Sequence, residues 1–411
     1  MSKLKPNELK NTDILWIPKT AQHWEVIRGK FIFKSEKIIN DKMQCKDRLA
    51  LTLKGVIDRF EGDNIGLNPN DLRTYQIFNS GDLVFKLIDL DNKKTSRVGY
   101  VHKKGIMSSA YIRIISNSSM NMRYFYYQYF DLYQRYIFND IGQGVRATMS
   151  SKDLLNIPIL VPPLAEQNAI VAYLDAKTQQ IQDFITKKQK LIQLLEEKLA
   201  IFISDSVSKH QSDWTIKKIK YTSKIFRGKF THRPRNDESL YNGKYPFIQT
   251  GDVARANKYI KEYTQTLNEK GYKVTTKFPK DTVVMTIAAN IGDVAILGFD
   301  ACFPDSVIGF YPQKEMLNDF LFYSLKSKKD FFLSIAVVNT QMNLNVERVG
   351  NIEIKVPPYS EQKNIVEKIL IFEDKITQAI TQAQKEIEKL KEYQESLITQ
   401  VVTGQLQVPM A

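Results

Sequence analysis

The sequence has very few of the side chains that hold metal ions or form disulfides. Its 411 residues include two cysteines, Cys45 and Cys302, and four histidines. Two distant cysteines make neither a disulfide framework nor a zinc cluster, and no two histidines have the spacing of metal ligands. The stretch 89–92 (DLDN) begins like a calcium loop, but Lys93 and a missing glycine break the pattern. We expect no metal site in this chain.

Long apolar runs are also missing. No stretch approaches the ~20 apolar residues that a membrane span needs, and the first ten residues, MSKLKPNELK, lack the apolar core of a secretion signal. Hydrophobic residues make up 43% and charged residues 25%, as in ordinary soluble globular proteins. These features predict a cytoplasmic protein with two or three globular parts.

The motifs of common enzymes are absent or incomplete. No glycine-rich loop follows a strand, and no phosphate-binding GxxxxGK[ST] loop exists. Val356-Pro357-Pro358-Tyr359 is similar to an amino-methyltransferase motif, but Val356 cannot hold an amino group. Pro304-Asp305 with Glu353-Ile354-Lys355 is similar to a nuclease set, but its spacing is long and the first half of the chain lacks it. We expect no catalysis, and a free-standing nuclease or methyltransferase with its own recognition domain stays as the alternative.

What the chain does have is one long stretch in two copies. Residues 156–174 (NIPILVPPLAEQNAIVAYL) match residues 351–369 (NIEIKVPPYSEQKNIVEKI) at an offset of 195 residues. Alternating apolar residues predict a short strand, which the prolines end. Pro163 and Pro358 can open a helix, and Glu166 and Glu361 then fall in the first turn, where the helix dipole favours an acid. A repeat of this length predicts two large units of one design.

Both predicted helices carry an apolar heptad stripe. The first stripe includes Ile181, Ile185 and Ile192, and the second includes Ile376, Ile380 and Ile387. Such spacing predicts coiled-coil pairing, and about 40 residues at ~1.5 Å each give roughly 60 Å of helix. Pairing within the chain would be antiparallel. Polar residues interrupt both stripes (Thr178 and Lys188 in the first, Glu373 in the second), and we expect them to weaken the pairing locally.

The net charge of +14 is confined to the two predicted globular parts. Residues 1–163 hold 25 Lys and Arg against 16 Asp and Glu, and residues 207–358 hold 23 against 15. The helices are close to neutral. Two basic parts joined by a neutral spacer indicate two nucleic-acid contacts. A generic basic surface is the alternative.

Within each globular part we expect short strands and one aromatic helix. The tetrad Arg-Gly-Lys-Phe occurs at 28–31 and at 227–230, an offset of 199 that is close to that of the main repeat. The aromatic helices are predicted at 122–138 and 318–335. Loops 142–146 (GQGVR) and 339–343 (NTQMN) follow them, and either is suited to a close approach to a partner or is an ordinary turn.

Together these features make the chain similar to the DNA specificity subunit of type I restriction–modification systems. The Pro-Pro and Glu-Gln pairs carry the resemblance, which covers nearly the whole chain: Pro162, Pro163, Glu166 and Gln167, then Pro357, Pro358, Glu361 and Gln362. It implies an α+β fold in which two similar mixed α/β target-recognition domains are separated by two long antiparallel coiled-coil helices, related by a pseudo-twofold repeat. The expected division is 1–163, 164–206, 207–358, 359–403 and a tail at 404–411.

The resemblance also implies partners. Each recognition domain would bind one half of a split target in double-stranded DNA, while the helices set the spacing and dock two modification (methyltransferase) subunits. The Pro-Pro and Glu-Gln residues would be docking or hinge residues. The modification subunits would hold S-adenosylmethionine, and restriction (motor-nuclease) subunits would need ATP and magnesium. This chain would bind no cofactor. A general two-lobed DNA-binding scaffold outside restriction is a further alternative.

Arg, Lys, Asn and Gln are the side chains that most often contact bases, and phosphates attract the same cations. The candidate DNA contacts of the first domain are Arg28, Lys30, Lys93, Lys94, Arg97, Gln143 and Arg146. Those of the second are Arg227, Lys229, His232, Arg233, Arg235, Arg255, Asn290, Gln341 and Asn343.

Overall fold

The chain divides into two compact units in a computed structural model. The first unit combines residues 1–188 with 385–411, and the second is 189–384. The structure describes residues 2–60, 71–92, 95–116, 119–142, 147–209, 213–336 and 344–409. Each unit takes part of both long helices, so the units do not follow the linear division of the chain.

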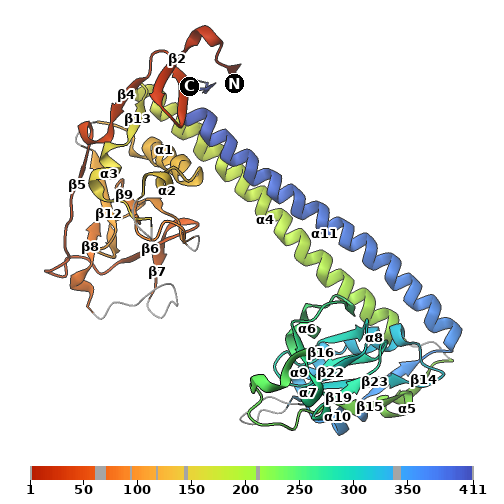
Figure 1. Cartoon of the computed structure of the whole chain (residues 1–411). Helices are drawn as coiled ribbons and strands as arrows, with labels where there is room; N and C mark the ends of the chain where they lie inside the picture. Colours follow the sequence, from red (N-terminus) through yellow and green to blue (C-terminus); the bar gives the residue numbers. More distant parts are fainter. Residues whose placement is uncertain are drawn as a thin grey trace. The chain divides into compact units, whose positions relative to one another are not determined.

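Two four-stranded sheets form the globular part of the first unit (Figure 1). In one sheet the order is β10 (Val98–Tyr100), β9 (Leu83–Phe85), β12 (Ile112–Ser116) and β5 (Phe33–Ser35), all antiparallel. In the other the order is β7 (Gly55–Arg59), β6 (Arg48–Thr52), β11 (Gly105–Met107) and β8 (Gln76–Phe78), with β11 parallel to β6. A two-stranded pair, β4 (Glu25–Arg28) with β13 (Pro158–Val161), leads into the first long helix.

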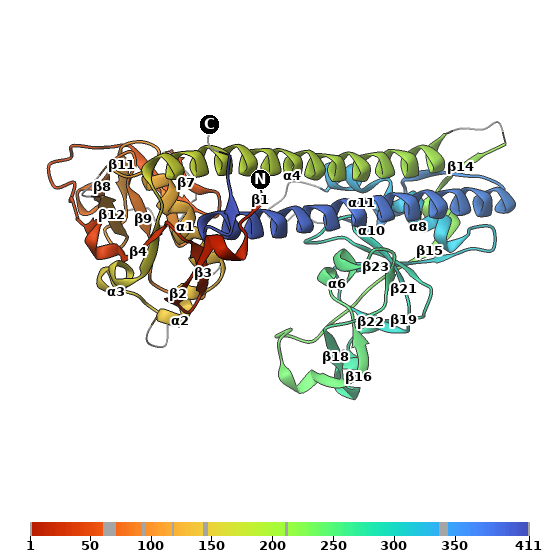
Figure 2. The same cartoon turned by 90° about the horizontal axis from the view of Figure 1, so that it is seen from above.

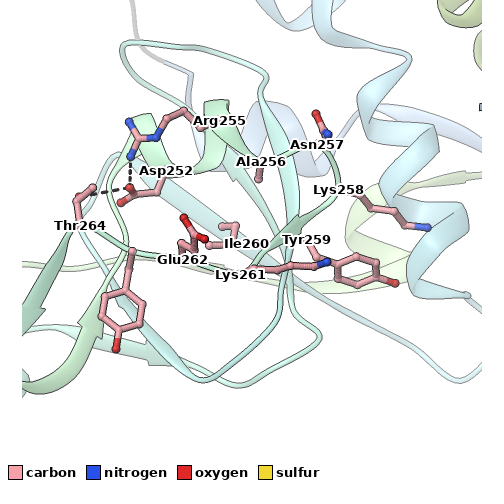
Figure 3. Close-up of a pocket in the computed structure, with 11 residues that line it drawn as sticks. Asp252, Arg255, Ala256, Asn257, Lys258, Tyr259, Ile260, Lys261, Glu262 and Thr264 are labelled. Carbon is pink, nitrogen blue, oxygen red and sulfur yellow. Dashed lines mark hydrogen bonds and ion pairs between the residues drawn. The ribbon is translucent and has the colours of Figure 1, made fainter. Parts of the chain in front are cut away.

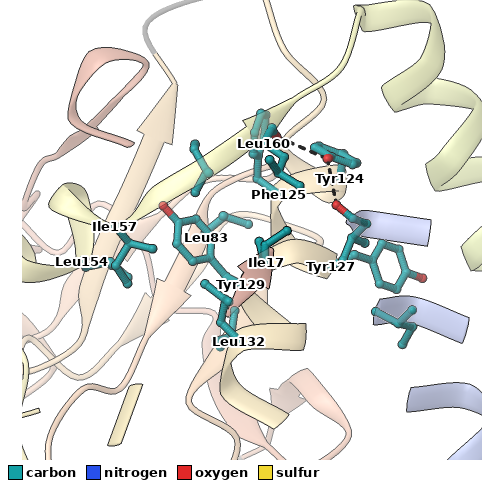
Figure 4. Packing of buried hydrophobic residues seen from close by; sticks show 14 of the residues in the cluster. Ile17, Leu83, Tyr124, Phe125, Tyr127, Tyr129, Leu132, Leu154, Ile157 and Leu160 are labelled. Atoms are coloured by element: carbon teal, nitrogen blue, oxygen red, sulfur yellow. Dashed lines mark hydrogen bonds between the residues drawn. The ribbon is translucent and has the colours of Figure 1, made fainter. Parts of the chain in front are cut away.

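An aromatic helix fills the core of the first unit, as Figure 4 shows. Helix α1 (Met122–Gln134) turns Phe125 and Tyr129 inward, and both are fully buried. Their rings meet strand residues edge-on, Phe125 against Phe33 at 4.9 Å and Tyr129 against Phe85 at 5.1 Å between centroids. Phe125 and Tyr129 are therefore part of the core, while Tyr136, near the end of the predicted helix, is half exposed.

Each predicted aromatic helix is two helices in the structure. In the first unit α1 ends at Gln134 and α2 (Ile137–Ile141) begins after Tyr136, whose φ of 61° is left-handed and stops the α-helix. In the second unit α8 (Asn318–Lys326) and α9 (Lys329–Ile335) are separated by two residues. The apolar periodicity passes over both breaks, which is why the sequence predicted single helices.

The two ends of the chain pair with each other in the first unit. Strand β1 (Ser2–Lys3) is antiparallel to β25 (Leu406–Gln407), beside the hairpin of β2 (Leu9–Ile14) and β3 (Ile17–Ala21). Gly404 makes the turn into β25 with a φ of +69°, and its Cα face lies on the buried Trp24 ring. Residues 404–409 are thus an ordered part of this unit rather than a loose tail.

The second unit repeats this plan. One sheet has the order β15 (Ser223–Arg227), β23 (Val307–Pro312), β20 (Val283–Thr286), β21 (Val294–Leu297) and β17 (Tyr259–Ile260). The other, seen in Figure 2, has the order β18 (Gln265–Leu267), β16 (Tyr241–Phe247), β22 (Ala301–Phe303) and β19 (Thr276–Phe278), with β16 parallel to β22. The pair of β14 (Thr215–Lys218) with β24 (Glu353–Val356) leads into the second long helix. The shorter helices of the second unit are α5 (Ile219–Thr222), α6 (Thr250–Arg255), α7 (Glu269–Lys273) and α10 (Val346–Gly350), and the first unit has α3 (Ser151–Asn156).

The strand register corrects one part of the predicted repeat. Arg28 lies opposite Pro158 in the β4–β13 pair, and the residue in the matching place of the second unit is Lys218, opposite Glu353. Arg227 instead ends β15, where it lies opposite Ile308. The two Arg-Gly-Lys-Phe tetrads therefore occupy different places, and their similar offset is not part of the structural repeat.

The long helices are α4 (Leu164–Ser208) and α11 (Tyr359–Val402). In the first unit, Ile170 and Leu174 near the start of α4 share a core with Leu397 and Val401 near the end of α11. In the second unit the end of α4 meets the start of α11, with the Phe202 and Phe372 rings at 4.2 Å. Start against end in both units means that the helix segments pair antiparallel, as predicted.

The polar residues that interrupt the apolar stripes have specific partners. Tyr127 of α1 donates a hydrogen bond to Asp175 at 2.5 Å and lies 3.3 Å from the Thr178 hydroxyl. Tyr323 of α8 donates to Glu373 at 2.7 Å. Burial is the main cause that raises the pKa of both phenols well above the ordinary value. These positions anchor the globular helix of each unit to its long helix. Lys188 forms an ion pair with Glu386 at 2.5 Å.

Candidate nucleic-acid interface

Two of the candidate cations of the first unit are exposed where β4 ends. Arg28 closes β4, and Lys30 follows in a 3-10 turn at Gly29–Phe31. Both side chains are exposed, and the Lys30 ammonium sits 5.3 Å from the centre of the exposed Phe31 ring. Gly29 is buried between them, because its N–H donates to the Ile157 carbonyl at 3.1 Å and a side chain there would press on Tyr129. The turn thus presents two cations and one aromatic ring to solvent.

Arg97 lies inside the protein, contrary to the expectation that it contacts DNA. Its side chain is fully buried, and its guanidinium donates to the carbonyls of Asp89 and Asn92 and, at 3.2 Å, to the Thr95 hydroxyl. Burial lowers the pKa of this guanidinium. Sequence alone does not tell which way a cation points. Arg97 shapes the loop that it holds instead of facing a partner.

Six of the candidate contacts lie outside the described residues. They are Lys93, Lys94, Gln143, Arg146, Gln341 and Asn343. They remain expectations from the sequence.

Three candidate arginines of the second unit meet at one residue, Asp305, two of them at its carboxylate and one at its backbone carbonyl. Asp305 lies in the turn between β22 and β23 and binds the Arg235 Nη2 with both carboxylate oxygens, at 2.6 and 2.8 Å. Arg233 Nη2 is 3.9 Å from the same carboxylate, and Arg227 Nε donates to the Asp305 backbone carbonyl at 2.9 Å. All three arginines are exposed. We call Arg227, Arg233, Arg235 and Asp305 the arginine cluster.

The neighbours of the arginine cluster hold its loop in place. Arg233 Nη1 donates to the Phe230 carbonyl at 2.7 Å, and Tyr241 donates its phenol hydrogen to the Arg235 carbonyl. His232 lies 2.8 Å from Asp237. Hydrogen bonds from Ser239 are the main cause that lowers the pKa of Asp237. His232 is therefore part of the loop scaffold, while Lys229 is exposed beside it.

Arg255 and Asn290 lie in other parts of the second unit. Arg255 ends α6 and lines an open pocket of about 480 Å³ with Tyr259, Tyr263 and Lys261 (Figure 3). Its guanidinium is tied to the buried Asp252 carboxylate. Asn290 is exposed in the turn between β20 and β21. The pocket belongs to an insertion, residues 248–264, because the matching strands β6 and β7 are joined by only Leu53 and Lys54.

The expected docking residues have two different environments. Gln167 and Gln362 are buried, at 2% and 0% exposure, so they do not offer a surface. Gln167 accepts the Asn121 N–H at 3.0 Å and donates to the Pro162 carbonyl at 2.9 Å. Pro162 and Pro357 are buried as well. Both glutamines tie a globular helix to the start of a long helix, which the sequence did not indicate because the partners are distant along the chain.

The other four members of that set have at least part of their surface open. Pro163 and Pro358 are exposed, and Glu166 and Glu361 are partly exposed. Each of these prolines accepts the backbone N–H groups of the Glu-Gln pair that follows, at 2.9 and 3.0 Å in both copies. Glu166 also lies 2.8 Å from His23. The first turn of each long helix is thus built alike, with an acid at its surface.

Among the described residues, no group of three or more His, Cys, Asp and Glu side chains could hold a metal ion. The same part of the chain has no helix that is both long and apolar enough to cross a membrane. Burial raises the pKa of the Cys302 thiol to about 11, which keeps it protonated and unreactive at neutral pH.

Comparison with known proteins agrees with this arrangement. The type I restriction enzyme MjaIX specificity subunit of Methanocaldococcus jannaschii is 27% identical over 180 residues, which are 43% of this chain and 41% of that protein. The putative MjaX specificity subunit of the same organism is 23% identical over 98% of both chains. One solved structure has the same fold, with a TM-score of 0.73 and 15% sequence identity. The match covers 94% of this chain and 99% of that one, which is described as the structural basis of complex assembly and conformational transition of the type I R-M system.

The family profile is the decisive match, because it covers most of the chain and occurs twice. The profile described as "Type I restriction modification DNA specificity domain" matches residues 24–196 and again 211–389, one copy for each half of the sequence repeat. The chain therefore belongs to the family of type I restriction–modification DNA specificity domains.

Proposed function

We propose that this protein is the non-catalytic subunit that gives a type I restriction–modification complex its DNA sequence specificity, with each globular part binding one half of a split target. The observation that carries the proposal is the duplicated plan. Apart from the added edge strand β17 in the second unit, both units have the same order of strands, and in each a long helix starts at a Pro-Pro pair. Two copies of one reader suit a target with two half-sites.

The charge distribution supports contact with DNA. The excess of Lys and Arg lies on the globular parts, and the long helices are nearly neutral. In the second unit the arginine cluster presents three guanidinium groups for one carboxylate, and in the first Arg28 and Lys30 are exposed at one turn. Arginine and lysine on such surfaces contact phosphates or guanine. The proposed contacts are these residues, with Lys229, Arg255 and Asn290.

The long helices are proposed to set the distance between the half-sites and to dock two modification subunits at the exposed Pro163, Pro358, Glu166 and Glu361. Methylation of adenine with S-adenosylmethionine would take place on those partners, and restriction subunits would use ATP and magnesium. The proposed location is the cytoplasm, where the host DNA is reached directly.

A free-standing nuclease is less well supported. Asp305, one of the two carboxylates in the nuclease-like set of the second unit, is bound by Arg235. A carboxylate held by guanidinium groups does not offer its oxygens to a metal ion. The Pro-Pro stretches lack the polar residue that an amino-methyltransferase needs, since Val161 and Val356 precede them.

The test is to co-express the chain with its neighbouring modification gene and to map N6-methyladenine in the host genome. We expect a split motif with a fixed gap that appears only when both chains are present. Methylation by the modification chain alone, or none with both, would refute the proposal. Incubation of the isolated chain with DNA and magnesium, or with DNA and S-adenosylmethionine, should give no product.

A further inference from the structure

The arginine cluster is built on a rigid base. Gly228 packs so closely on the turn before Asp305 that a Cβ atom there would lie 2.0 Å from the Pro304 carbonyl oxygen. Its N–H donates to the Val307 carbonyl at 2.8 Å, and the Lys229 N–H donates to the Phe303 carbonyl at 3.0 Å. Residues 228–229, which lead into the arginine cluster, are therefore held firmly against the turn that carries Asp305.

The position of Asp305 is not explained by stability. Its side chain is 35% exposed, and Arg233 and Arg235 are 56% and 51% exposed, so water screens these ion pairs and they stabilise the fold little. A carboxylate on a basic surface also repels phosphate, which weakens general attraction to DNA. An acid in this place needs another role.

That role follows from the geometry of Arg235. Both carboxylate oxygens of Asp305 hold a single nitrogen, Nη2, and the Tyr241 phenol holds the Arg235 carbonyl. Within the part of the chain that the structure describes, Nε and Nη1 of Arg235 have no protein partner. A free arginine side chain has many rotamers and contacts phosphate in any of them, whereas a held one offers its remaining N–H groups in a fixed direction.

We infer that Asp305 is a positioning residue that fixes Arg235 to donate to a guanine edge in the half-site bound by the second unit. Guanine O6 and N7 are the acceptors that arginine most often recognises in the major groove. Arg227 and Arg233 supply positive charge beside it. Arg227 donates to the Asp305 backbone carbonyl, and Arg233 donates to the Phe230 carbonyl. The inference rests on the proposed function and names which group of the second unit selects a base.

The test compares Asp305→Asn with Asp300→Asn as the matched control. Asp300 is another surface acid of the second unit, paired with Lys277 at 2.8 Å, so its loss changes the net charge equally without touching an arginine. Asparagine keeps an acceptor oxygen at both sites. Each variant, and Arg235→Ala, is purified with its modification subunits, and binding is measured to the mapped target and to duplexes with one base pair replaced.

We expect Arg235→Ala to reduce discrimination at one G·C pair, by about 5-fold to 150-fold for loss of a good base contact, and not at the others. Asp305→Asn should lower discrimination at the same pair while binding to unrelated DNA is unchanged or stronger. Asp300→Asn should keep the discrimination of the natural chain. Asp305→Glu, which retains the charge, should recover part of it.

Three results would overturn the inference. Full discrimination in Asp305→Asn would show that Asp305 positions nothing. A uniform loss over all duplexes in Arg235→Ala would make Arg235 a phosphate contact. If the natural complex has no mapped target, the proposed function fails and this inference with it, whereas a mapped target with unaffected variants removes the inference alone. Thermal melting of each complex identifies a variant that loses binding because it unfolds, in which case Asp305→Glu decides.

Discussion

Gln362 accepts the backbone N–H of Leu317 at 2.8 Å and so joins the start of the globular helix α8 to the first turn of α11. The same side chain donates from Nε2 to the carbonyls of Glu315 and Pro357, at 2.8 and 2.9 Å. In the first unit Gln167 makes the matching bond to Asn121. Because the helices α1 and α8 carry the sheets with them, one glutamine in each unit fixes how the globular part meets its helix.

We therefore expect Gln362→Ala to lower the free energy of unfolding by about 1–3 kcal/mol, since it leaves buried polar groups without partners. Gln362→Glu should cost at least as much, because a carboxylate repels the two carbonyls that the amide now satisfies. The control is Gln378→Ala on the same helix, where the amide bonds only Asp374 at the surface. Urea denaturation followed by circular dichroism measures all three. Equal midpoints for Gln362→Ala and the control would contradict this role.

The anchor between Tyr323 and Glu373 predicts a pH dependence. Burial, and next the bond to Glu373, raises the pKa of the Tyr323 phenol far above its ordinary value near 10. In the unfolded chain the phenol loses its proton near pH 10, and in the folded chain it does not. Its contribution to stability is therefore complete below pH 10 and declines as the pH rises above that value.

Tyr323→Phe should remove part of this alkaline decline, so that its stability falls less steeply than that of the natural chain above pH 10. At pH 7 the variant should lose about 1 kcal/mol through the missing hydrogen bond. Tyr311→Phe is a suitable control, because Tyr311 is 55% exposed. Thermal melting between pH 7 and 11 gives both effects. A parallel pH profile for Tyr323→Phe and the natural chain would show that another group causes the decline.

The repeat and the pairing of the long helices could be predicted from the sequence because their causes are local. Proline cannot continue a strand, and a heptad stripe shows its period directly. The roles of Gln167, Gln362 and Arg97 could not be predicted, since each depends on which carbonyl or N–H lies nearby in the fold. The Glu-Gln pairs were predicted as subunit-docking or hinge residues. The structure adds that the glutamine of each pair is buried and bonds a globular helix, while the glutamate is partly exposed.

The Arg-Gly-Lys-Phe tetrads show the opposite error. The same four residues at an offset close to that of the main repeat suggested equivalent positions. In the structure Arg28 is the last residue of β4, which pairs with β13, whereas Arg227 is the last residue of β15, which pairs with β23. Four residues occur twice by chance more easily than strand order does, so only the register distinguishes them. From the sequence alone, Asp305 belongs to a chance nuclease-like set. Its contacts with three arginines could not be predicted, because those arginines are at least 70 residues away along the chain.

The two basic parts should be exchangeable. We predict that replacing residues 1–163 with the first domain of another family member changes one half of the methylated motif and leaves the other half and the gap unchanged. The reason is that the first unit and the second unit each have complete sheets and a core of their own. Methylome mapping of the hybrid, expressed with the natural modification subunit, measures this. A change in both half-sites would contradict separate recognition.

The length of the paired helices should set the gap between the half-sites. Adding one turn to α4 and one to α11, at Lys188 and at Lys385, lengthens the pair by ~6 Å, because four residues rise about 1.5 Å each. One base pair of DNA occupies about 3.4 Å, so the preferred gap should grow by about two base pairs. Deleting one turn from each helix should shorten it equally. The control replaces the same four residues without a change of length, and it should keep the natural gap. Each variant is tested by mapping methyladenine in cells that contain targets of several gap lengths. An unchanged gap in the lengthened and the shortened chains would show that the DNA spacing is fixed elsewhere in the complex, because the helices would then have changed length without moving either reader along the DNA.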